Sequence, residues 1–98
     1  MSYLALCTFD LKSASRQDYE TAYSDLEKLG LKKIIVANNG NNVVIPTTTV
    51  TGSFTGQSAS SVCEYVRDKV KSAFSSRSFS SEIFVMVGGD WSWAGSTT

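Results

Sequence analysis

The order in which hydrophobic patterns change along this chain is the feature that most limits its fold. Two segments carry apolar residues at helical spacing, and each stands between segments rich in strand-forming residues. The chain therefore predicts the order strand, helix, strand, strand, helix, strand. The apolar stripes of the two predicted helices are Tyr19, Tyr23, Leu26 and Leu29, and Val62, Val66, Val70 and Phe74.

Both helices are preceded by residues that favour a helix start. Ser15 with Asp18 three residues later resembles a capping box, and Gly30 is suited to the left-handed conformation that ends a helix. Ser61 with Glu64 is the candidate capping box of the second helix. The first helix is therefore expected to begin just after Ser15 and the second just after Ser61.

The strand segments are separated by turn residues. Tyr3 to Phe9 is a continuous apolar run that ends at Asp10, "KKIIVA" is the second strand and "EIFVMV" the last. Pro46 divides "VVIPTTTVTGSF", because proline has no N–H to donate to a strand ladder, so residues 47–54 are the better core strand. "NNGNN" predicts a turn, since Asn and Gly tolerate positive φ.

This order is the βαββαβ pattern of ferredoxin-like domains, an α+β fold in which an antiparallel sheet carries both helices on one face. A chain of 98 residues makes a single domain, with residues 88–98 as a C-terminal tail or a short extra strand. No segment approaches the roughly 20 apolar residues of a membrane span, and the first residues lack the pattern of a signal peptide. A cytoplasmic protein without a membrane partner is expected.

Charge and composition exclude several classes of function. Nine Lys and Arg balance nine Asp and Glu, so there is no electrostatic reason for tight, sequence-independent nucleic-acid binding, and any nucleic-acid contact has to be local. Histidine is absent, which removes the commonest general base and transition-metal ligand. Cys7 and Cys63 have no metal-type spacing and are expected to be buried free thiols.

The first and last strands are apolar on both faces. Leu4 and Leu6 point away from the other apolar residues of the first strand, and Phe84 and Met86 do so in the last. Because the helices cover one face only, the second face would form an apolar patch, which predicts a homodimer through the sheet. The alternative is that both strands are flanked by neighbours and only carry extra apolar area.

Asp10 is the candidate chemical group. At the end of a strand it either caps the turn by accepting backbone N–H groups around Lys12 and Ser13, or holds a metal ion. The loop "KSASR", with Lys12, Ser13 and Arg16, is either a phosphate or partner contact at a helix N-terminus or a plain connection with its cap.

Several short motifs resemble a known group of proteins. These motifs are "TFDL", "DYETAYSDLEKLG", "TTTVTGSF", the pair Arg67 and Asp68, and "FVMVGGDWSWAG". They resemble small ferredoxin-like proteins similar to the second CRISPR-associated adaptation protein, to virulence-associated protein D, and to SinR-like and GhoS antitoxin proteins.

The resemblance implies a catalytic role for Asp10 as the metal ligand of a nuclease. It also implies a dimer packed sheet to sheet, with C-terminal segments crossing between chains, which places Trp91 and Trp93 in the interface beside Phe84 and Met86. The chain departs from the group in its neutral charge and in the insertion "ANNGNNVVIP", which is expected to lengthen the second and third strands.

Two hypotheses of different classes remain. The first is a metal-dependent endonuclease or endoribonuclease acting on RNA or DNA, in which Asp10 of each chain of the dimer holds Mg²⁺ or Mn²⁺. The second is a non-catalytic interaction module, an antitoxin-like, phage-encoded or regulatory dimer that binds a protein or an RNA. The position of Asp10 and the resemblance favour the first, and the neutral charge and the lack of a second clear catalytic residue favour the second.

Overall fold

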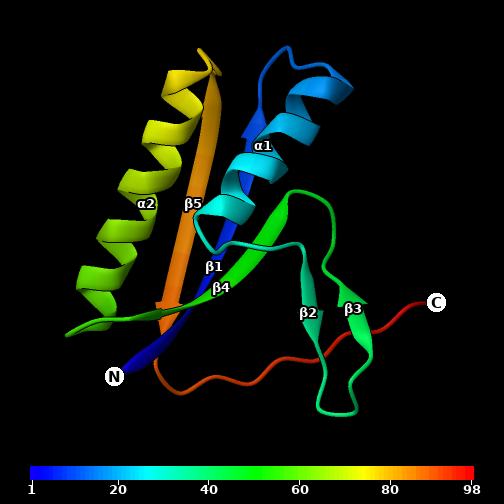
Figure 1. Ribbon diagram of the computed structural model, residues 1–98, viewed down its shortest axis with the longest axis vertical. Coiled ribbons are helices and arrows are strands. Elements are labelled where there is room, and N and C mark those ends of the chain that lie inside the picture. The colour runs from blue at the N-terminus through cyan, green and yellow to red at the C-terminus, as the bar shows by residue number, and fades with distance from the viewer.

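A computed structural model describes residues 1–98 and confirms the α+β fold, with both helices on one face of an antiparallel sheet (Figure 1). The main sheet has three strands in the order β4-β1-β5, and β2 and β3 pair with each other in a second sheet. Along the chain the elements are β1 Ser2–Leu11, α1 Arg16–Lys28, β2 Ile34–Val36, β3 Asn42–Val44, β4 Thr49–Thr55, α2 Ala59–Ser76 and β5 Ser81–Gly88.

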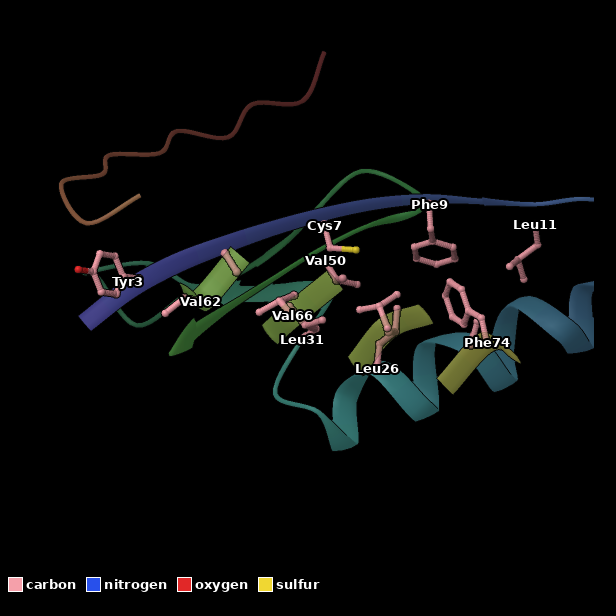
Figure 2. Packing of buried hydrophobic residues seen from close by; sticks show 13 residues of the cluster. Tyr3, Cys7, Phe9, Leu11, Leu26, Leu31, Val50, Val62, Val66 and Phe74 are labelled. Atoms are coloured by element: carbon pink, nitrogen blue, oxygen red, sulfur yellow. The ribbon is translucent and has the colours of Figure 1, made fainter. Parts of the chain in front are cut away.

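The hydrophobic core lies between the main sheet and the two helices. Alternate residues of β1 point into it, and Phe9 meets Phe74 of α2 with ring centroids 5.3 Å apart (Figure 2). The stripe predicted for the second helix is confirmed, because all its members are buried. The buried residues are Tyr3, Ala5, Cys7, Phe9, Leu11, Ala22, Leu26, Leu31, Val50, Val62, Val66, Val70 and Phe74.

The helix starts show one confirmed prediction and one error. Ser15 caps α1 in a capping box with Asp18, as predicted. The second box is wrong, because α2 begins at Ala59 with Ser58 as its cap. The Ser58 hydroxyl accepts from the Ser61 N–H at 3.1 Å, and the Ser61 hydroxyl accepts from the Ser58 N–H at 3.2 Å. A serine at the third helical position can thus complete the box in place of the expected glutamate.

The prediction that the insertion "ANNGNNVVIP" lengthens the second and third strands is wrong, because β2 and β3 have three residues each and form a sheet of their own. Residues 34–44 form a separate hairpin of β2, β3 and their turn, which we call the arm; the insertion supplies the turn and β3. The arm joins the main sheet next to the bridge between Lys32 and Thr51, whose two backbone hydrogen bonds are 2.8 and 2.9 Å long. Pro46 separates the arm from β4, and Gly40 forms its turn at a φ of +85°.

The second face of the main sheet is turned away from the helices, and we call it the open face. In Figure 2 the helices lie on one side of β1, while residues of the C-terminal tail lie on the other side. Neither helix is long and apolar enough to cross a membrane. The open face is formed by Leu4, Leu6, Thr8 and Asp10 of β1, Glu82, Phe84 and Met86 of β5, and Thr49, Thr51 and Ser53 of β4.

Candidate functional site: the open face of the sheet

The open face carries an apolar patch on the side of β5. In the strand register Leu6 lies between Met86 and Thr51, and Thr8 lies between Phe84 and Thr49. The side chains of Phe84 and Met86 are 57% and 61% exposed, although their neighbours on the strand pack against the core. The sequence left open the alternative that the first and last strands each have a neighbouring strand on both sides. This is correct for β1 and wrong for β5, which forms an edge of the sheet.

Asp10 lies at the other end of the open face. It is the penultimate residue of β1, which runs past the predicted strand end to Leu11. The Tyr19 hydroxyl lies 3.2 Å from the Asp10 carboxylate Oδ1 and 3.1 Å from the Leu11 carbonyl oxygen, so one hydroxyl proton is shared between these two acceptors. The expected cap to the loop is wrong for Lys12, because the backbone N–H of Lys12 donates to the Ser80 carbonyl at 2.8 Å. Asp10 therefore presents an exposed carboxylate near the end of β1, within hydrogen-bond distance of a tyrosine from α1.

A second carboxylate stands opposite Asp10. Glu82 is its partner in the register of β1 and β5. The Lys12 ammonium lies 2.7 Å from Glu82 Oε1, and its hydrogen bond and charge lower the pKa of Glu82, while the same contact raises the pKa of Lys12. Both groups stay charged near neutral pH, so this end of the open face combines two carboxylates with one ammonium.

These residues offer a limited ligand set for a metal ion. No cluster of three or more His, Cys, Asp or Glu side chains occurs in the chain. Mg²⁺ is commonly held by one or two carboxylates, with waters filling the other positions. Asp10 fits that requirement from one chain, and Glu82 would add a second carboxylate only if it released Lys12.

The predicted phosphate loop is already occupied by side chains of the chain itself. The Asp18 carboxylate accepts from the Ser15 N–H at the N-terminus of α1, the place where an anion would bind. Arg16 lies 3.5 Å from Glu20 in the next turn of the helix. Ser13 adopts a φ of +51° in the connection. The structure brings Lys12 to the open face, whereas Arg16 pairs along its own helix.

The C-terminal tail, residues 89–98, contains no helix or strand. Trp91 and Trp93 are 41% and 38% exposed and do not belong to the buried core. A Cβ added at Gly95 would lie 3.1 Å from Cγ1 of Val43, so the tail reaches the arm. Both tryptophans thus have apolar surface left for another molecule, as the prediction for the interface requires.

Sequence reasoning missed the arm as a surface. Ile34, Val36 and Val44 are 42%, 63% and 70% exposed. The signal was the consecutive apolar residues within "KKIIVA" and "NNVVIP", because side chains alternate between the two faces of a strand and such a run leaves apolar residues on both faces of a hairpin.

Comparison with models of known protein families gives no match, and no curated protein shows significant sequence similarity to the chain. The resemblance to the CRISPR-adaptation and antitoxin group therefore stays a prediction. Function has to be inferred from the open face and the groups around it.

Proposed function

We propose that the chain is a self-associating interaction module whose open face binds a second copy of itself. The observation that carries this proposal is the apolar patch of Phe84, Met86 and Leu6 on a sheet face that no helix covers. A homodimer built on a two-fold axis brings the same patch from both chains together, so the patch is its own complement. The dimer would present its remaining surface to a protein or an RNA.

The exposed area of the chain supports association. A compact monomer of 10.6 kDa is expected to expose about 5,500 Å². This chain exposes 6560 Å². The projecting arm and the irregular tail contribute to this excess of about 1,100 Å², which is of the same order as the roughly 800 Å² that each partner buries in a standard interface.

The oligomeric state tests the proposal directly. Light scattering behind a sizing column should give twice the 10.6 kDa chain mass for the wild type. Phe84→Glu should give a monomer, because an unpaired charge in an apolar interface is costly. Tyr65→Glu is the matched control, since Tyr65 is 53% exposed on α2, away from the open face, and it should stay dimeric. A wild type that remains monomeric at every concentration contradicts the proposal.

A metal-dependent nuclease is the second candidate function. It is favoured by the cross-strand pair of Asp10 and Glu82 at the end of the same face that would form the interface. Asp10 would hold the ion, Tyr19 would orient its carboxylate, and Lys12 could contact a phosphate after leaving Glu82. When bound, Mg²⁺ or Mn²⁺ would polarise a phosphate oxygen or activate water.

Asp10→Asn separates this candidate from the binding module. The amide keeps the shape and the hydrogen bond from Tyr19 but is a much weaker ligand for a hard cation. The nuclease hypothesis predicts that Mg²⁺ or Mn²⁺ raises the melting temperature of the wild type only, and that the variant loses cleavage of RNA or DNA. Equal behaviour of both proteins in melting and cleavage would leave the interaction module alone.

A further inference from the structure

The arm presents an apolar face that the rest of the chain does not cover. Ile34 stands opposite Val44 in the β2–β3 register, and Val36 stands two residues beyond Ile34, so all three share one face. Their exposures run from 42% to 70%. The opposite face is less exposed and meets the tail, where Val43 lies against Gly95.

An isolated two-stranded hairpin is marginally stable in water, and the strands of the arm have three residues each. The arm is held to the main sheet next to the bridge between Lys32 and Thr51, and in Figure 1 it projects from the β4 side of the molecule. Apolar β-branched residues on a projecting hairpin are explained if another molecule covers them.

The open face is too small to form a stable interface without further surface. Its three strands span about 14 Å and the rows from Leu4 to Asp10 about 23 Å, which gives a projected footprint of roughly 330 Å², smaller than the accessible area of the side chains that stand on it. A stable interface buries about 800 Å² on each partner. The β4 strip of the open face is also polar, being formed by Thr49, Thr51 and Ser53. Additional apolar area must come from the surface beside the sheet, and the arm adjoins its β4 edge.

We propose that the arm of each copy packs on the second copy and completes the interface that the open face begins. This inference rests on the proposed self-association. The arm lies beyond β4, whereas Phe84 and Met86 lie on β5 at the opposite edge of the main sheet. When two open faces pack together about a two-fold axis that runs roughly along the strands, the β4 edge of one copy lies over the β5 edge of the other. The arm of one copy therefore lies beside β5 of the other. There Ile34, Val36 and Val44 cover the unpaired edge and the outer side of Phe84.

Val36→Lys and Val44→Lys test the arm, with dimer dissociation measured by sedimentation at several concentrations. Each change enters an isologous interface twice, so each should weaken dimerisation about a hundred-fold. Val44→Thr keeps the shape and strand preference of valine and should weaken it by a smaller factor. Tyr65→Lys, at a site on α2 that is 53% exposed, should leave dimerisation unchanged.

Two controls separate the possible failures. In the Phe84→Glu background the arm variants should melt like their parent, because the substituted side chains are exposed in the single chain. If wild type dimerises, Phe84→Glu does not, and all arm variants keep the wild-type dissociation constant, the arm inference is overturned and the proposed function stands. A monomeric wild type overturns both.

Discussion

Gly52 is the position where a single added methyl group should do most damage to this fold. The loop after α1 crosses β4 at Gly52, and a Cβ there would lie 2.1 Å from the Gly30 carbonyl oxygen and 3.0 Å from its carbon. The obstacle is backbone and cannot rotate away. Gly52→Ala must therefore push the loop and β4 apart.

The size of the effect follows from the contacts that this movement disturbs. The shortest carbon to oxygen contacts in proteins are about 3.3 Å, so the loop must move by about 1.2 Å. Such overpacking costs about 1–3 kcal/mol. The movement also strains the two backbone hydrogen bonds between Lys32 and Thr51, worth about 1 kcal/mol each. The expected loss is about 3–5 kcal/mol, a large share of the roughly 5–15 kcal/mol that stabilises a domain of this length.

Urea unfolding followed by tryptophan fluorescence and circular dichroism measures this loss. Gly88→Ala is the matched control, because Gly88 also lies in a strand but a Cβ there would meet nothing within 4 Å. It should stay within about 0.5 kcal/mol of wild type. The reasoning is refuted if Gly52→Ala unfolds at the same urea concentration as Gly88→Ala and wild type, compared at one protein concentration.

Two further predictions concern ionisable groups. Arg77 at the end of α2 donates two hydrogen bonds, 2.9 and 3.1 Å long, to Asp25 of α1 and lowers the pKa of that carboxyl. This stabilisation is present above the unfolded-state pKa and is lost as the pH falls through the lower folded-state value. Arg77→Gln should therefore lower the stability in urea unfolding at pH 7, by a small amount because the pair is solvent-exposed, and this cost should shrink as the pH is lowered. A cost that does not change with pH would exclude the pair as its cause. Burial raises the pKa of Cys7 to about 11, so in a Cys63→Ser variant the remaining thiol should react with a disulfide reagent only as the chain unfolds. Rapid reaction of the native variant would show that β1 opens locally.

Much of the fold could be predicted because the residues that repeat at helical spacing in the sequence are also the residues that are buried or half-buried in the structure. Val62, Val66, Val70 and Phe74 repeat at helical spacing and all are buried, so packing and pattern specify the same helix. The start of α2 was misplaced because both Ser58 and Ser61 satisfy the local chemistry of a cap. Only the tertiary packing decides between two such candidates.

The arm could not be predicted, because its position depends on a close approach between distant residues. The bridge between Lys32 and Thr51 forms only where the backbone at Gly30 passes close to Gly52. Nothing in the local sequence "KKIIVA" indicates that Lys32 alone pairs with β4. The two-faced apolar pattern of β5, by contrast, predicted the exposure of Phe84 and Met86 correctly. A strand pattern reports which residues share a face, but not which other segment covers it.

If the copies associate through the open face and the arm completes that interface, the direction of the two-fold axis also determines where the two Asp10 residues lie. A two-fold axis along the strands carries Asp10 of both copies to the same end of the interface, whereas an axis across the strands carries them to opposite ends. In the first arrangement two clusters of Asp10, Glu82 and Lys12 meet with four carboxylates and two ammonium groups, so like charges oppose association. A divalent cation bound between them would relieve that repulsion. We therefore expect Mg²⁺ to tighten the wild-type dimer and to leave Asp10→Asn unchanged, in sedimentation at constant ionic strength. If, without the ion, the Asp10→Asn dimer is no tighter than the wild-type dimer, the two Asp10 carboxylates do not repel each other. They then lie apart, which excludes the axis along the strands.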